Sequence, residues 1–196
     1  MASKSGVHTD VGAKVTHSTW TQTTNFVVVS TVGFLFDYAQ ARGLGTDKIT
    51  NKRDDLESAL YTYINTRHLR KVSIEVYEEG ASRSEEAVER FDLTFEVKDP
   101  KDLTKSEQEE MVDKEFNQYR KDVMKQLQDL DSLPENVDYR ILIWCVPEND
   151  LGQEKPDVDG WSSTSARSTD NLNKKNIGDD AIKTPAITAD ASLWVR

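Results

Sequence analysis

WTQTTNFVVVSTVGFLFDY, residues 20–38, is the segment on which the predicted core is built. Its mostly apolar positions recur at steps of three and four, the spacing of an α-helix. The residues at these steps are Trp20, Thr24, Val27, Val28, Thr31, Phe34, Leu35 and Tyr38. The opposite face carries Phe26, Val29 and Phe36. A helix that is apolar on all sides is expected to lie buried, so this segment predicts the central helix of one domain.

A strand is the competing prediction for the same segment, because FVVVSTV at 26–32 is rich in β-branched residues that favour sheets. Length favours the helix. The apolar pattern runs until ARGLG at 41–45, where two glycines are typical of a helix end.

A helix, a pair of strands and a second long helix are predicted downstream. The first helix opens at Thr50 or Asn51 and ends near His68, with acidic residues in its first turns and one apolar face. Alternating apolar and polar residues at 72–77 and 91–98 then predict a half-buried antiparallel hairpin or meander.

The next helix is predicted to begin at Thr104 as its N-cap and to end before SLPEN at 132–136. Its expected buried stripe is Val112, Phe116, Tyr119, Val123, Leu127 and Leu130. A strand follows at 139–146. Because both of its faces are apolar, it is expected to lie in the centre of the sheet.

The chain divides by composition into three parts. Residues 1–15 are small or polar and without period, which indicates a flexible leader. Residues 16–147 are expected to hold the core. Residues 148–196 are mostly polar with scattered apolar side chains, so their order is expected to depend on sheet hydrogen bonds or a partner. Within them, Ala186–Val195 could dock as an edge strand.

Charge and cysteine content exclude several classes of function. The chain has 196 residues, of which 25 are basic and 35 acidic, giving a net charge of −10. This surplus argues against direct binding of nucleic acid. The single cysteine, Cys145, can form neither an intrachain disulfide framework nor a Cys-based zinc site. With no membrane span and no signal peptide expected, the predicted location is the cytoplasm.

Catalytic motifs are not apparent. His8, His17 and His68 belong to no known catalytic or metal-binding pattern, and His68 is interpreted as a charge at a helix end. Acidic runs such as Glu85-Glu86 and Glu109-Glu110 are most simply solvated faces, although a hydrolase using such carboxylates is a third, weaker hypothesis. DVDG at 157–160 resembles the start of a calcium loop, but position twelve would be Ser168, which favours a plain turn. No cofactor or metal is predicted.

The most specific motif is KPDVDGWSSTSARSTD, residues 155–170. Together with THSTW at 16–20 and LRKVSIEVY at 69–77, it makes the chain resemble the bacterial HORMA-domain proteins of CBASS anti-phage operons. The resemblance covers nearly the whole chain from about residue 15.

This resemblance implies an α+β HORMA fold, in which three helices pack on an antiparallel sheet and residues 148–196 form a mobile safety belt. The belt would wrap around a short closure-motif peptide that adds to the sheet as a strand. The closed form would bind and activate a cGAS/DncV-like nucleotidyltransferase (CD-NTase), and an AAA+ ATPase that remodels HORMA domains would engage the N-terminus to reset it. Such a protein is a regulator without enzymatic chemistry. The alternative is a scaffolding HORMA protein that supplies a terminal peptide to a second HORMA protein.

The resemblance also selects the residues expected to bind the peptide and lock the belt. These are Val158, Trp161, Arg167, Ser168, Thr169, Asp170 and Trp194. Trp161 is the best single anchor, because a lone Trp in a polar segment can bury a large area; the alternative is that it only covers the base of a loop. Arg167 and Asp170 could form a hydrogen-bonded knot or a solvated pair.

Overall fold

The computed structural model describes residues 9–82, 85–99 and 113–196. Its helices are α1 (Thr9–Ala41), α2 (Asp47–Asn51), α3 (Arg53–Asn65), α4 (Asp113–Gln128) and α5 (Glu148–Leu151). Its strands are β1 (Leu69–Glu78), β2 (Glu89–Val97), β3 (Val137–Cys145), β4 (Asn173–Lys183) and β5 (Ile187–Val195). Within that part of the chain, no helix combines the length and the apolar character that crossing a membrane requires.

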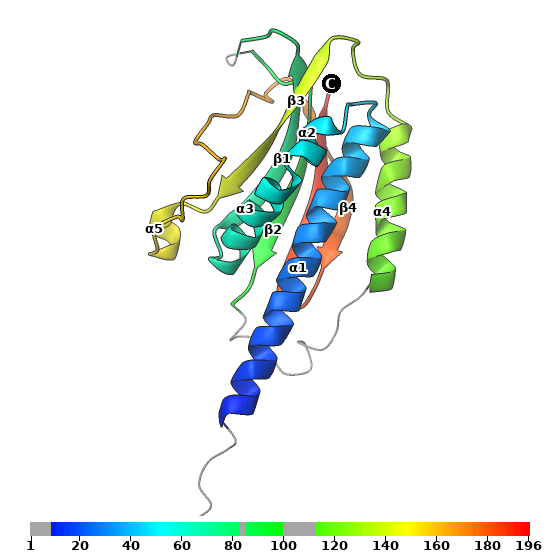
Figure 1. Ribbon diagram of the computed structural model, residues 1–196. Helices are drawn as coiled ribbons and strands as arrows, with labels where there is room; N and C mark the ends of the chain where they lie inside the picture. Colours follow the sequence, from blue (N-terminus) through cyan, green and yellow to red (C-terminus); the bar gives the residue numbers. More distant parts are fainter. Residues whose placement is uncertain (1–8, 83–84, 100–112) are drawn as a thin grey trace, which may run out of the picture.

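The five strands form one antiparallel sheet in the order β3-β1-β2-β5-β4. Helices α1 to α4 lie together over one face of this sheet, as Figure 1 shows. The predicted α+β architecture, with three long helices on an antiparallel sheet, is therefore confirmed, and two short helices, α2 and α5, are added to it.

Helix α1 confirms the helical reading of residues 20–38, since it continues through all the β-branched positions. Thr31 adapts to the helix by donating its hydroxyl to the carbonyl of Val27 at 2.7 Å. The helix starts at Thr9, so the predicted leader 1–15 overlaps its first turns, and residues 1–8 lie outside the described residues.

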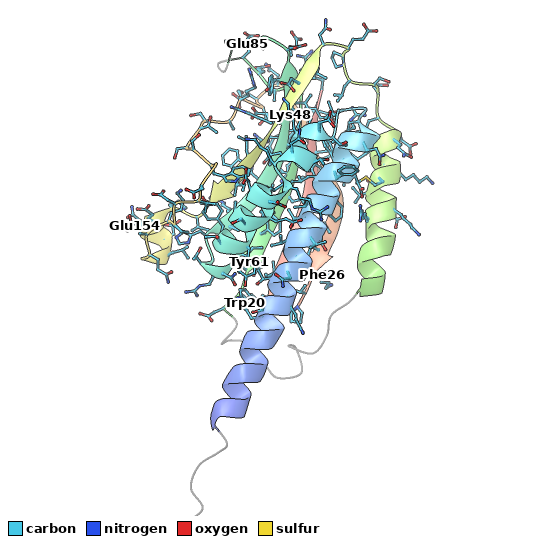
Figure 2. All side chains as sticks on the ribbon, in the orientation of Figure 1. Trp20, Phe26, Lys48, Tyr61, Glu85 and Glu154 are labelled. Carbon is cyan, nitrogen blue, oxygen red and sulfur yellow. The ribbon has the colours of Figure 1, made fainter. Side chains whose placement is uncertain are left out.

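The burial expected all around α1 is wrong on one side. Val27 and Phe34 are fully buried, but Val29 is 55% exposed and Phe26 and Phe36 are only half-buried. The reason is that α1 packs between α3 and α4 on the sheet and keeps one narrow face outside these contacts. Figure 2 shows Trp20 and Phe26 at the lower end of this helical layer.

A buried ion pair fastens the other end of α1 to the sheet. The guanidinium of Arg42 donates to both carboxylate oxygens of Glu89 at 2.8 and 2.9 Å, and the hydroxyl of Tyr38 donates to the same carboxylate at 2.6 Å. Burial and this carboxylate raise the pKa of Tyr38 well above its usual value, so the phenol stays neutral and keeps its hydrogen bond.

The other predicted elements are confirmed with shifted boundaries. The antiparallel hairpin β1–β2 is present, and the helix expected from Thr50 is α3. The expectation that the hairpin is half-buried was wrong, because its alternate polar residues Ser73, Glu75 and Asp92 are buried through hydrogen bonds and ion pairs on the other face. Of the next helix, the structure describes Asp113–Gln128, and its predicted N-cap, Thr104, lies outside the described residues. Val123 and Leu127 of its predicted stripe are buried.

The prediction that the strand at 139–146 is central was wrong, because β3 is an edge strand. Its two apolar faces have another cause. Ile141 and Ile143 pack against the core, while Leu142 on the opposite face is buried as well. An edge strand covered on both faces has the same sequence pattern as a central strand.

The C-terminal residues contribute more to the fold than their composition indicates. Strand β5 confirms the strand expected at Ala186–Val195, but it lies between β2 and β4 and is not an edge. Strand β4 was not predicted. Ile177, Ile182 and Leu193 of this hairpin belong to the hydrophobic core, which therefore continues past Pro147.

Candidate functional site

The residues between β3 and β4, 146–172, form a long segment that we call the connector. It leaves the sheet at α5 and runs beside β3 to the loop between β1 and β2 at the other end of the molecule, as Figure 1 shows. Glu154 and Glu85, labelled in Figure 2, mark these two ends. The connector thus follows an edge of the sheet before it joins β4 at the opposite edge.

The free edge of β3 faces the connector without pairing to it. β3 exchanges backbone hydrogen bonds with β1 through the register Val72–Ile143 and Ile74–Ile141. Across the described residues, no backbone hydrogen bond joins β3 to the connector. An unpaired edge strand offers a row of main-chain donors and acceptors to an added strand.

Two cavities lie between β3 and the connector, and we refer to the pair as the edge channel. One has a volume of about 470 Å³ and reaches Tyr63, Cys145 and Lys155. The other has about 580 Å³ and reaches Lys52 and Arg140. Both are lined by Ile141, Leu142, Trp161, Ser162 and Thr164. The channel therefore has one wall on the sheet, one on α3 and one on the connector.

Trp161 lies where the two cavities meet. The indole is half-buried, packs against the core and donates its Nε1–H to the carbonyl oxygen of Asp55 in α3 at 3.3 Å. Val158, three residues earlier, is also half-buried against the core. The middle of the connector therefore contacts the core through Val158 and Trp161, and Trp161 also contacts α3; their role in locking a peptide stays a prediction.

The DVDG motif before Trp161 is a turn, as predicted. The amide of Trp161 donates to the carbonyl of Val158 at 3.2 Å, and Gly160 has φ +79°. A Cβ at Gly160 would lie 3.4 Å from a carboxylate oxygen of Asp55, so a side chain here would meet both backbone strain and close contact. No group of three metal-ligating side chains occurs in the part of the chain that the structure describes.

Arg167 binds the sheet rather than Asp170, so the structure does not contain the predicted knot. Its amide donates to Glu75 Oε2 at 2.8 Å, and its guanidinium reaches carbonyls of the β1–β2 loop. Asp170 is exposed, and its amide donates to the hydroxyl of Ser168 at 3.0 Å. The backbone carbonyl of Ser168 accepts the amide of Ala87, and the carbonyl of Thr169 accepts the amide of Leu172, each at 3.0 Å.

Trp194 is remote from the edge channel. It lies on β5, and its Nε1–H donates to the buried carboxylate of Asp92 at 2.9 Å. The same carboxylate accepts the hydroxyl of Ser73 at 2.6 Å and the ammonium of Lys71 at 3.2 Å. The geometry thus separates Trp194 from Val158 and Trp161, and gives it a part in docking the C-terminal hairpin on the sheet.

Two titratable groups of the channel are held neutral by burial. Burial raises the pKa of the Cys145 thiol, with Lys155 acting in the opposite direction. Burial also raises the pKa of Tyr63, whose ring lies 5.7 Å from the ammonium of Lys155. A neutral thiol is a poor nucleophile, so the channel wall at Cys145 is suited to contact and not to covalent chemistry.

His68 does not lie exposed at a helix end. It is 1% exposed, and its Nε2 lies 3.4 Å from the carbonyl of Gln153 in the connector. The interpretation of His68 as a charge at the end of a helix was therefore wrong, because the residue is buried and lies outside α3. The helix α3 ends three residues earlier, at Asn65, and the chain turns inward there.

Comparison with known proteins gives the family. A model described as bacterial HORMA domain 2 matches residues 12–196. The chain belongs to this family of bacterial HORMA domains. The expected HORMA fold is therefore confirmed. A search of curated proteins finds no match.

Several solved structures share the fold at low sequence identity. C. elegans HTP-2 bound to the HIM-3 closure motif is 13% identical, with a TM-score of 0.64 over 90% of this chain and 91% of that chain. HTP-2 bound to HTP-3 closure motif 1 is 15% identical, with a TM-score of 0.65 over 90% and 87%. A chain of the mitotic checkpoint complex is 12% identical, with a TM-score of 0.65 over 88% and 98%.

Two acidic residues that contact the connector were missed by sequence reasoning. Glu75 reads as the polar position of an alternating strand, and Asp55 as an acidic residue in a first helical turn. Both contact the connector, 92 and 106 residues away in the chain. The sequence gives little signal for Glu75. It is a charged residue within a strand, and strand alternation alone does not indicate that such a residue is buried.

Proposed function

We propose that this HORMA protein binds a closure-motif peptide in the edge channel and holds it with residues 148–196, which act as its safety belt. The observation that carries this proposal is the unpaired edge of β3, which faces two cavities lined on their other side by the connector. An extended peptide entering there would pair its main chain with β3, as in other cases of strand addition.

The lining of the channel favours a peptide in which apolar and polar side chains alternate. Ile141, Ile143 and Tyr63 offer apolar surface on the side of the helices, while Ser162 and Thr164 offer hydroxyls on the connector. Side chains of an extended peptide point alternately to opposite sides, so one set would meet each wall. Main-chain pairing supplies affinity and the two walls supply selection.

We further propose that the closed, peptide-bound form binds and activates a cGAS/DncV-like CD-NTase in the cytoplasm, without enzymatic chemistry of its own. An AAA+ remodeller would reset it by engaging the leader 1–15. The support for these partners is the resemblance of PDVDGWSSTSARSTD at 156–170 to the HORMA proteins of CBASS operons. The alternative is a scaffolding role, in which the protein supplies a terminal peptide to a second HORMA protein.

The test starts from a peptide-display screen on the purified full chain. Hits are titrated by calorimetry, and each bound peptide is then added with the protein to a purified candidate CD-NTase. We expect micromolar or tighter binding and peptide-dependent synthesis of a cyclic nucleotide. Peptide binding without stimulation would refute the activator role, and absence of any bound peptide would refute the channel as a ligand site. A complex formed with a second HORMA protein through this chain's own terminal peptide would favour the scaffolding alternative.

A further inference from the structure

Arg167 is the one fully buried side chain of the connector between Val146 and Asn171, a range that the structure describes without gaps. It is 5% exposed, whereas the other side chains of this range are half-buried or exposed. Burying a guanidinium is costly unless its donors and charge are matched, so a specific site must compensate this residue.

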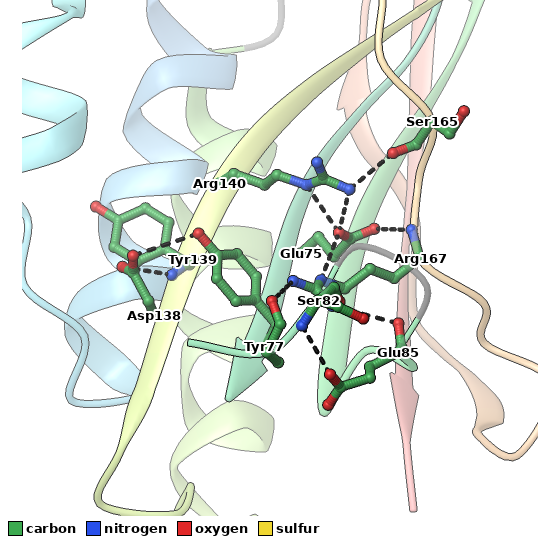
Figure 3. Close-up of polar contacts among 10 residues, drawn as sticks. Glu75, Tyr77, Ser82, Glu85, Asp138, Tyr139, Arg140, Ser165 and Arg167 are labelled. Atoms are coloured by element: carbon green, nitrogen blue, oxygen red, sulfur yellow. Dashed lines mark hydrogen bonds and ion pairs between the residues drawn. The ribbon is translucent and has the colours of Figure 1, made fainter. Parts of the chain in front are cut away.

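That site is formed by the end of β1 and the loop after it, as Figure 3 shows. The Arg167 Nη2 donates to the carbonyl of Ala81 at 3.0 Å, and Nη1 donates to the carbonyls of Ser82 and Glu85, the latter at 3.3 Å. The guanidinium carbon lies 4.4 Å from the centre of the Tyr77 ring. Three carbonyls and an aromatic face therefore surround one planar cation.

Glu75 fixes the main chain of the connector at the same point. Its side chain is fully buried and lies 3.7 Å from Arg167 Nε, while its Oε2 accepts the Arg167 amide at 2.8 Å. Its other oxygen accepts Arg140 Nε at 2.8 Å, and Arg140 also donates to the carbonyl of Ser165. The carboxylate thus joins β1, β3 and the connector, as the dashed lines in Figure 3 show.

We propose that Tyr77, the carbonyls of Ala81, Ser82 and Glu85, and the carboxylate of Glu75 form a guanidinium-binding cradle. Arg167 fills it and thereby sets how often the connector opens. The inference rests on the proposed function, because it concerns the opening of the edge channel. A planar guanidinium can donate to several carbonyls while stacking on a ring, which an ammonium cannot do.

Arg167 acts on opening and not on ligand contact, because it lines neither cavity of the edge channel, although Tyr77 of the cradle lines the second one. The neighbouring residue Ala166 does line one of them. A segment with few buried apolar groups opens locally with a low free energy, so loss of its one buried polar anchor should raise the open population strongly.

Hydrogen exchange on the full chain without peptide tests the proposal. In Arg167→Ala, we expect the amides of Ala87 and Leu172, which bond across or within the connector end, to exchange at least about tenfold faster. Amides of β2 and β5 should keep the exchange rates of the unchanged protein. Glu154→Gln, which removes an exposed charge of the connector outside the channel lining, is the control and should leave both amides unchanged.

Rescue by a small cation identifies the cradle itself. Guanidinium chloride at a non-denaturing concentration should slow exchange in Arg167→Ala, whereas ammonium chloride at the same ionic strength should not. Arg167→Lys keeps the charge and is expected to fold, but should still exchange at least about threefold faster. Exchange equal to the unchanged protein in Arg167→Lys, or the absence of guanidinium-specific rescue, would overturn the cradle. Failure of all peptides to bind, with these exchange effects present, would overturn only the proposed function.

Discussion

Replacing Trp161 by alanine removes the anchor that holds the middle of the connector against α3. The lost indole covers the meeting point of both cavities and donates to the Asp55 carbonyl at 3.3 Å. A buried Trp covers about 150–250 Å². For a half-buried ring, a loss of about 100 Å² corresponds to about 2.5 kcal/mol. Part of this free energy also stabilises the empty protein, so we expect peptide affinity to fall at least about tenfold, or about 1.4 kcal/mol.

The assay is calorimetric titration of a display-selected peptide into the unchanged protein, Trp161→Ala and Trp194→Ala. Trp194 is a matched control, because it lies on β5 and contacts Asp92 instead of the channel. Trp194→Ala should bind the peptide within about threefold of the unchanged protein, provided that its circular dichroism shows a folded chain. Equal affinity of Trp161→Ala and the unchanged protein would refute the assignment of the channel, and an equal loss in both variants would refute its separation from Trp194.

Further predictions concern the channel, the core and the surface of α1. Because burial raises the pKa of Cys145, iodoacetamide should alkylate its thiol more slowly in the folded chain at pH 8 than in the unfolded chain. Bound peptide should slow the alkylation of Cys145 further, and an unchanged rate on peptide addition would place the ligand elsewhere. Glu89→Ala leaves Arg42 buried without its partner and should lower the free energy of unfolding by about 3–5 kcal/mol in urea, whereas Glu57→Ala in an exposed pair should change it by under about 0.5 kcal/mol. The free energy of unfolding of Val29→Asp should lie within about 0.5 kcal/mol of that of the unchanged protein, whereas Val28→Asp should be strongly destabilised. Similar effects of the two substitutions would contradict the orientation of α1.

The local elements of this fold could be predicted because each has a strong periodic signal. Residues 20–38 form a helix despite their β-branched content, since the apolar pattern is longer than a strand allows. Strands β1 and β2 form where the alternation predicts strands, although the structure buries both faces of the pair. Strand β4 carries NKKNIGDDAIK, in which polar residues dominate, and its pairing with β5 supplies the order that its composition does not predict.

The candidate site was only partly predictable. The segment around Trp161 was found through its motif, and its position against α3 agrees with an anchor. The partner of Arg167 was not found, because Glu75 is 92 residues away in the chain and resembles any other polar position of a strand. Trp194 was grouped with the belt residues, but β5 places it across the sheet from them.

The amino-acid sequence by itself determined the three long helices, the β1–β2 hairpin, the family and the polar character of the residues after Pro147, because periodicity, composition and a specific motif are local properties. Tertiary structure alone decided that β3 lies at an edge of the sheet. Because β3 is covered on both faces, its sequence has the pattern of a central strand. Tertiary structure also decided that the connector is fastened by Arg167, because a buried charge is compensated by groups that only the folded chain brings together.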